Sequence, residues 1–218
     1  MLPGTEELAP GLHCWTAFHQ EWKKEVTCVA LDTPDGLVLV DPLAPPALAA
    51  ARRFWKALDR AVAARAQPVA VVLTLHYHER SAGAVLDRYG SSPGARLWAP
   101  IGSLSRLGTA VDHPFAPGDA LPGDVHVLPS GRPDEVVLWV PWARALVTGD
   151  VLIGGVRKPY RVCPPSWLPT TVSRREVARA LQPLLDLDVD LLVPLHGPPV
   201  TSSAHEVLAA AVDEALTG

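Results

Sequence analysis

Two histidines, two residues apart, follow an apolar stretch in the first half of the chain. Residues 69–74 are mostly apolar and β-branched, which predicts a buried strand, and His76 and His78 come directly after it. Side chains at positions i and i+2 of a strand or strand-like turn point to the same side, so both imidazoles can face one metal ion. Taken alone, such a pair is more often two loop histidines that face solvent, because His-x-His is short and common.

Two further residues of metal-ligand type follow later apolar stretches. Asp150 comes after residues 143–148, and His196 comes after residues 191–193. If the strands are neighbours, these side chains and the histidine pair converge on one crevice at a sheet edge. Two imidazoles and a carboxylate form a ligand set for Zn²⁺ or Fe²⁺ with a position left open for water. The candidate metal ligands are therefore His76, His78, Asp150 and His196.

The elements that must position these residues follow from the hydrophobic pattern. Strands are expected over 12–19, 25–32, 37–40, 69–74, 95–99, 136–140, 143–148 and 191–193. Helices are expected over 47–66, 82–89 and 173–185, with a last helix that begins at residue 202 or 203. Several strands precede the first long helix, and strands and helices then alternate. This order predicts an α+β fold in which two packed sheets are covered by helices, within a single domain over residues 1–218.

Residues 151–170 contain several prolines and basic side chains, and this composition predicts a long loop. A loop of this length inside a compact domain is usually functional or mobile. If the loop covers the crevice, Tyr160 and Arg161 are candidates for contact with a substrate, and Ser81 is a third weak candidate.

Composition restricts the class of protein. The chain has 218 residues, 48% of them apolar and 19% charged, with a formal net charge of −4, as expected for a soluble globular protein. It has no basic stripe, so nucleic acid is not an expected partner. No apolar run approaches the roughly 18 residues that would span a bilayer, and no membrane partner is expected. Three widely separated cysteines favour reduced thiols and a cytoplasmic location. A homodimer remains open.

Four pieces of the sequence, in this order, resemble the metallo-β-lactamase-fold superfamily. Residues 39–42 read Leu-Val-Asp-Pro, like the end of that family's first hairpin, and residues 74–78 read Thr-Leu-His-Tyr-His, like the start of its Thr-x-His-x-His-x-Asp-His motif. Residues 146–150 read Leu-Val-Thr-Gly-Asp, like the strand whose Asp bridges two metals, and residues 194–197 read Pro-Leu-His-Gly, like the closing Pro-Gly-His-Gly. The resemblance implies a four-layer αββα sandwich of two mixed β-sheets flanked by helices, with the site at one edge.

The chain also departs from this pattern. Arg80 and Ser81 stand where the motif has Asp-His, and Gly131 stands where a histidine ligand is expected. A guanidinium cannot bind a metal ion, and its permanent charge would repel a second cation. The resemblance therefore implies a depleted site with at most one metal ion.

Three functions remain open. The first is a mononuclear metal-dependent hydrolase of a small ester, thioester or lactone, in which Asp150 helps to hold one Zn²⁺ or Fe²⁺. The second is a metal-free protein in which Arg80 pairs with Asp150 in place of a metal and the crevice binds a small polar ligand. The third is metal-independent catalysis by Ser81 with a histidine base, although no nucleophile elbow is present. Each of these hypotheses implies a small-molecule ligand or substrate.

Overall fold

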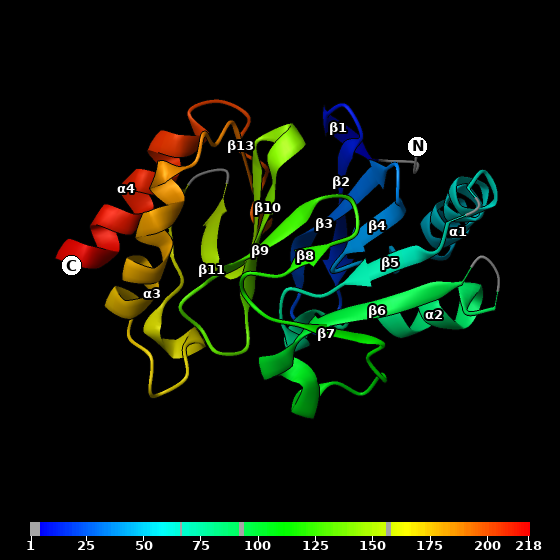
Figure 1. Cartoon of the computed structure of the whole chain (residues 1–218), viewed down its shortest axis with the longest axis horizontal. Coiled ribbons are helices and arrows are strands. Elements are labelled where there is room, and N and C mark those ends of the chain that lie inside the picture. Colours follow the sequence, from blue (N-terminus) through cyan, green and yellow to red (C-terminus); the bar gives the residue numbers. More distant parts are fainter. Residues whose placement is uncertain (1–4, 66, 92–93, 156–157) are drawn as a thin grey trace. The chain divides into compact units, whose positions relative to one another are not determined.

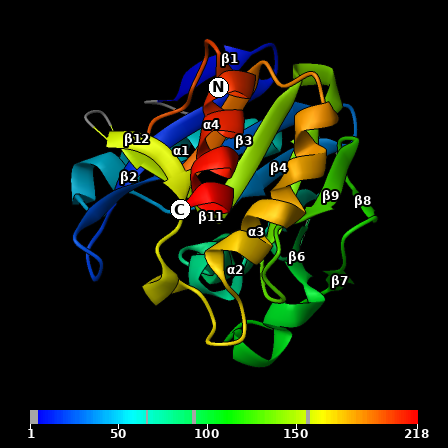
Figure 2. The same cartoon turned by 90° about the vertical axis from the view of Figure 1, so that its left-hand side faces the viewer.

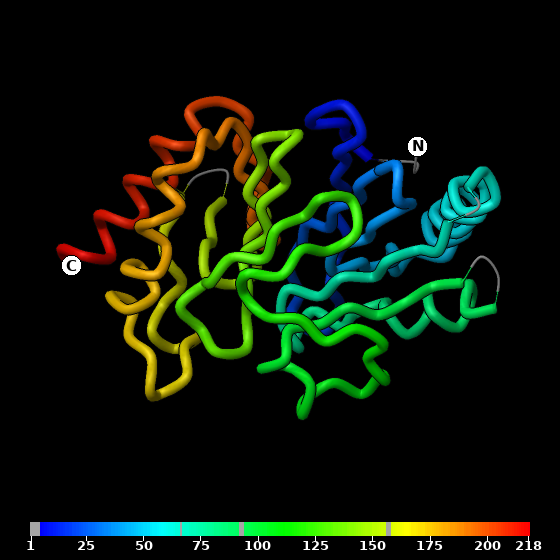
Figure 3. Tube along the Cα trace, viewed as in Figure 1, coloured from blue at the N-terminus to red at the C-terminus, as the bar shows by residue number. Residues whose placement is uncertain are grey.

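The computed structural model describes residues 5–65, 67–91, 94–155 and 158–218. Its contacts divide the chain into two compact units, Met1–Phe115 and Ala116–Gly218. Each unit consists of one β-sheet and its helices, as the chain trace in Figure 3 shows. The expectation of a single domain stays a prediction.

The first unit contains a seven-stranded mixed sheet in the order β1-β2-β3-β4-β5-β6-β7. Strands β1 to β4 form an antiparallel meander, and β4 to β7 run parallel. The change of direction at β4 follows from the connections, because short turns join the first four strands and helix α1 joins β4 to β5. The strand bounds are β1 (Glu6–Ala9), β2 (Leu12–His19), β3 (Lys24–Thr33), β4 (Gly36–Val40), β5 (Val69–Val72), β6 (Ala95–Pro100) and β7 (His113–Phe115).

Two helices cover one face of this sheet, α1 (Leu48–Ala63) and α2 (Ala82–Tyr89), and Figure 1 shows both beside β4 to β6. Phe54 and Leu58 of α1 and Val85 of α2 share one buried cluster with Leu39 and Val71 of the sheet. The apolar residues of α1 recur at helical spacing, so a single face of the helix is buried. This packing fixes the ends of β4 and β5. Asp41 follows the first of these strands, and His76 and His78 follow the second.

The second unit contains a six-stranded sheet in the order β12-β11-β10-β9-β8, in which β13 pairs with β11. All pairs are antiparallel except β11 with β13, which is parallel. The strand bounds are β8 (Ala120–Leu121), β9 (Val125–Pro129), β10 (Val136–Val140), β11 (Ala145–Gly155), β12 (Lys158–Val162) and β13 (Leu191–His196).

Helices α3 (Arg174–Leu181) and α4 (Ala204–Thr217) pack against this second sheet and against each other, as Figure 2 shows. Val177 of α3 and Leu208 of α4 lie in one buried cluster with Leu146 and Leu192 of the sheet. The start of α3 is fixed by a capping box, in which Ser173 and Glu176 each bond to the other's backbone N–H. No helix in the described parts of the chain is both long and apolar enough to span a bilayer.

Three predicted elements differ from the structure. Residues 151–170 are not one long loop, because β11 continues to Gly155 and pairs with β12. Residues 108–124 are rich in Pro, Gly and Asp, which favours an irregular loop, but they contain the short strands β7 and β8. Helix α3 ends at Leu181 rather than 185, since Pro183 has no N–H for the next helical hydrogen bond, and a 3₁₀ helix follows.

Candidate metal centre

The best-defined contact in the first unit joins His78 to Asp41. His78 Nδ1 lies 2.6 Å from Asp41 Oδ2, and neither side chain is exposed. When Nδ1 carries the proton and donates it to a carboxylate, Nε2 keeps its lone pair for a metal ion. This contact therefore prepares His78 for metal binding through Nε2.

Asp41 is held in place by Thr74. The backbone N–H of Thr74 donates to Asp41 Oδ1 over 2.8 Å, and its hydroxyl donates to Oδ2 over 2.5 Å. Asp41 also has a positive φ of 46°, which a non-glycine residue rarely adopts. A fully buried, strained and multiply bonded aspartate is typical of a site that fixes another residue. The sequence favours a simple turn aspartate before Pro42 here, so this role was missed.

His76 lies in a different environment from His78. The sequence predicts strand-like backbone for the pair, but residues 76–78 form the 3₁₀ helix η1 (His76–His78), so the predicted local geometry was wrong. With three residues per turn, side chains at i and i+2 lie about 120° apart around the axis. His76 Nε2 lies 3.4 Å from Nη1 of Arg106, and the ring lies 4.0 Å from that of Tyr77. Metal binding by His76 stays a prediction.

Arg80 bonds to backbone carbonyls of its own unit. Its Nη1 donates to Asp41 O over 3.0 Å and to Thr27 O over 3.3 Å. The guanidinium carbon lies 5.7 Å from the centre of the Trp22 ring, within the range of a cation–π contact. These contacts join the turn after β4 to β3, and they place a permanent charge close to the backbone of Asp41.

Ser81 immediately precedes α2. Its hydroxyl accepts a hydrogen bond from the backbone N–H of Ala44 over 3.0 Å, and its own N–H donates to Pro42 O over 2.9 Å. These contacts tie the 42–44 segment to the start of the helix. They do not supply the histidine base that a nucleophilic serine requires.

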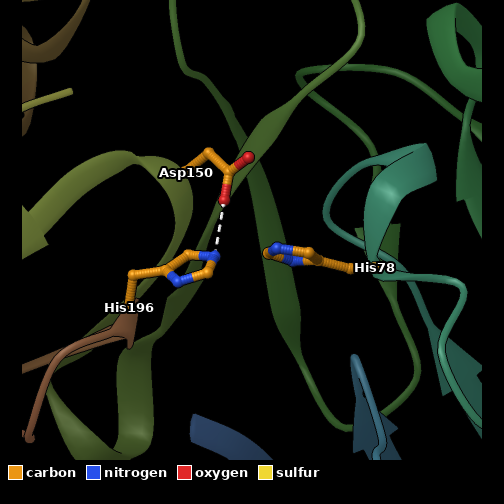
Figure 4. A group of neighbouring side chains, drawn as sticks. All are labelled: His78, Asp150 and His196. Atoms are coloured by element: carbon orange, nitrogen blue, oxygen red, sulfur yellow. Dashed lines mark ion pairs between the residues drawn. The ribbon is translucent and has the colours of Figure 1, made fainter. Parts of the chain in front are cut away.

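The second unit brings Asp150 and His196 together. Asp150 Oδ1 lies 2.9 Å from His196 Nε2, the contact drawn as a dashed line in Figure 4. Asp150 lies in an irregular part of β11, where the register with β13 shifts between Thr148 and Ile153. A register shift of this kind interrupts the regular alternation of side chains along a strand. The Trp167 ring also meets the His196 ring edge-on, with centroids 5.5 Å apart.

A buried arginine lies on the other side of Asp150. Arg132 Nη1 is 4.0 Å from Asp150 Oδ2 and 3.1 Å from Glu135 Oε2, and Arg132 Nε is 3.3 Å from Asp134 Oδ1. The loop between β9 and β10 that carries Arg132 is closed by Ser130, whose hydroxyl donates to Glu135 O over 2.7 Å. Sequence reasoning missed Arg132 and Glu135, and the only available signal was the position of Arg132 next to Gly131.

Burial dominates the electrostatics of this cluster. Burial and the neighbouring Asp150 carboxylate raise the pKa of Glu135 well above its ordinary value, although Arg132 and the Val151 N–H oppose the shift. Burial, followed by Glu135, raises the pKa of the Cys163 thiol to about 12.

Gly131 occupies the position at which the family resemblance implies a histidine ligand. Its φ is +84°, and a Cβ at this position would lie 2.8 Å from Val177 Cα and 3.0 Å from Ala180 Cβ. Helix α3 therefore occupies the space that any side chain at position 131 would need. The structure excludes a ligand here without movement of that helix.

Two of the three weak substrate candidates lie on β12 rather than in a loop, and the third is Ser81. Tyr160 donates its hydroxyl to Pro198 O over 2.5 Å, and Arg161 is exposed on the same strand. Their contact with a substrate stays a prediction.

Comparisons with known proteins identify the fold. No protein-family model and no curated protein sequence matches the chain. Among solved structures, the chain resembles the metallo-β-lactamase DIM-1 with a TM-score of 0.69 and 15% identity, over 99% of this chain and 100% of that one. It resembles the metallo-β-lactamase FIM-1 from Pseudomonas aeruginosa in its mono-zinc form with a TM-score of 0.65 and 15% identity, over 98% and 96% of the two chains. A metallo-β-lactamase family protein from Thermus thermophilus gives a TM-score of 0.67 and 17% identity, over 97% and 80%.

The chain therefore has the metallo-β-lactamase fold, and the α+β class with two mixed sheets flanked by helices is confirmed. The family resemblance drawn from the four sequence motifs is thereby confirmed at the level of fold.

Proposed function

We propose that the protein binds one Zn²⁺ or Fe²⁺ ion through His78, Asp150 and His196 and is a metal-dependent hydrolase of a small ester, thioester or lactone. These three side chains, drawn in Figure 4, each offer a nitrogen or oxygen atom of metal-ligand type.

The observation that carries this proposal is the contact between His78 Nδ1 and Asp41. A buried carboxylate on the far nitrogen of a histidine is the usual support of a metal-binding imidazole, because it fixes both the tautomer and the ring orientation. With the proton on Nδ1, Nε2 is the ring nitrogen that would bind a cation. The contact with Asp41 thus favours a metal-binding role for His78 over a purely structural role in the core.

The residues of the second unit also fit a single ion. Asp150 Oδ1 and His196 Nε2 lie 2.9 Å apart, so two atoms of metal-ligand type already adjoin. Arg80 bonds to carbonyls of Asp41 and Thr27, which is compatible with an Asp150 that binds metal. The contact between His76 and Arg106 favours leaving His76 out, so the proposed ligand set has three members rather than four.

The chemistry divides between the ion and the chain. When bound, the ion would polarise a substrate carbonyl and lower the pKa of a water molecule. Asp41 keeps the proton of His78 on Nδ1, and Trp167 shields one edge of the His196 ring. Similarity to FIM-1 in its mono-zinc form supports a one-metal site, although that description belongs to FIM-1.

A second candidate is a metal-free protein whose crevice binds a small polar ligand. It is favoured by the direct contact between Asp150 and His196 and by the cation of Arg132 4.0 Å from Asp150. In this candidate Arg132, rather than Arg80, provides the positive charge beside Asp150.

Metal content distinguishes the two candidates. Protein purified without chelator should contain about one equivalent of Zn or Fe, and His78→Ala should reduce this content to background because one of three ligands is lost. His126→Ala is the matched control, since His126 is exposed and pairs with Asp124 on the surface. Hydrolysis of a thioester and a lactone probe should fall on chelation and return with the ion. Wild-type protein with no metal above background would reject the first candidate in favour of the second.

A further inference from the structure

Arg132 is a buried cation to which the sequence motifs give no role. Only 2% of its side chain is exposed, and three carboxylates surround it. The guanidinium is anchored on one edge by Asp134, with Nε to Oδ1 at 3.3 Å and Nη2 to Oδ2 at 3.5 Å. Its remaining nitrogen, Nη1, lies on the side of Glu135 and Asp150.

Nη1 has an unusual environment. It is buried and makes no hydrogen bond within the described residues, although Glu135 Oε2 lies only 3.1 Å away. The interaction of Nη1 with Glu135 and Asp150 is thus one of charge rather than of directed hydrogen bonds. An arginine cannot lose its proton in a protein, so this positive charge is permanent.

We propose that Arg132 is the resident counter-cation of Asp150, and that it limits the site to one metal ion. Arg132 is a positioning residue in this role, because it acts on the carboxylate and not on a substrate. It neutralises one side of Asp150 and leaves the other side, at Oδ1, for His196 and a single ion. The limit to one ion rests on the proposed function, whereas the contact between Arg132 and Asp150 does not.

The neighbouring loop explains why an arginine can take this role. Gly131 removes any side chain that would compete for the space, and the backbone N–H of Arg132 donates to Ser130 Oγ over 3.1 Å. A guanidinium anchored in this way keeps its charge in one position. A second divalent cation beside Asp150 would meet this fixed charge at short range, where the protein screens repulsion poorly.

The first test uses metal-free protein. In the presence of EDTA, the imidazole resonances of His196 are compared by NMR in wild type, Arg132→Gln, Arg132→Lys and the exposed control Arg144→Gln. We expect Arg132→Gln to move the His196 Nε2 resonance, Arg132→Lys to stay closer to wild type, and Arg144→Gln to match it. If Arg132→Gln does not fold, Arg132→Gln/Glu135→Gln also replaces the buried carboxyl group that faces the cation and should show the same displacement.

The second test measures Co²⁺ binding to the same proteins by calorimetry and elemental analysis. Wild type should bind one ion, and Arg132→Gln should bind it at least about tenfold more tightly because the repulsion between cations is gone. A His196 resonance that is unchanged in Arg132→Gln, or equal Co²⁺ affinities in that variant and wild type, would overturn the inference. Wild type that takes up no Co²⁺ would contradict the proposed function instead, and the metal-free spectra would then decide the role of Arg132.

Discussion

At the residue scale, the candidate centre depends on how Asp41 holds His78. Asp41 adopts a positive φ of 46° and accepts from both the N–H and the hydroxyl of Thr74 as well as from His78 Nδ1. These bonds compensate for a buried carboxylate in an unfavourable backbone conformation. The same bonds fix the imidazole before any ion arrives, which reduces the entropy lost on binding.

Replacement of Asp41 by Asn tests this arrangement. The amide retains the size of the side chain but lacks the charge that holds the proton on Nδ1, so metal affinity should fall roughly 10- to 100-fold. Zinc competition with a chromophoric chelator measures the change. Asp213→Asn, on the exposed face of α4, is the control and should leave affinity unchanged. Equal affinities for Asp41→Asn and wild type would show that His78 does not bind the ion.

At the element scale, the loop between β9 and β10 determines which ligands the second unit can offer. The sequence shows that position 131 offers no metal ligand. It does not show that the backbone leaves no room for a ligand side chain at this position. Helix α3 lies against Gly131, with Val177 Cα 2.8 Å from the site of a Cβ. By contrast, the register shift in β11 lies where the second unit does offer ligand-type atoms, at the contact of Asp150 with His196.

Substitution of Gly131 should therefore destabilise the fold rather than restore a metal ligand. Gly131→Ala should lower the free energy of unfolding by about 2–4 kcal/mol, from a positive φ and from overlap with α3. Gly118→Ala is a matched control, because its φ of +100° carries the same backbone penalty but no atom lies within 4 Å of the added Cβ. Gly118→Ala should lower the free energy of unfolding by only about 1–2 kcal/mol. Urea denaturation compares the two, and equal losses would argue against the contact with α3. Gly131→His should bind no additional metal.

At the scale of the whole molecule, Glu135 links stability to pH. Burial, and then Asp150, raises its pKa in the folded protein well above the ordinary 4.5. The folded state thus holds this proton more tightly than the unfolded state does. Its contribution to stability is complete below about pH 4.5 and is lost as the pH rises toward the folded pKa.

Glu135→Gln should remove this dependence, because the amide cannot ionise. The free energy of unfolding of the variant minus that of wild type should increase as the pH rises above 4.5, until the folded pKa is passed. Urea denaturation at a series of pH values in EDTA measures the difference. Glu25→Gln, exposed on β3, is the control. Parallel profiles for Glu135→Gln and wild type would contradict the raised pKa.

Much of the fold could be predicted because periodicity and end signals are local. The helix at 82–89, the strand at 136–140 and the start of a helix at Ser173 are all confirmed. The strand β12 was not predictable from its own residues, since Lys158–Val162 is mostly polar and is exposed over most of its length. Its pairing with β11 depends on tertiary context that local pattern does not encode.

The sequence by itself determined the metallo-β-lactamase fold motifs, the order of the strand ends and the identity of most ligand-type residues. It also determined the absence of a histidine at position 131, because residue types are read without reference to space. Only the tertiary structure decided that Asp41 supports His78, that His76 lies beside Arg106, and that Arg132 is the cation near Asp150. These contacts join residues 18 to 37 positions apart, and only the folded backbone sets which side chains meet across such separations.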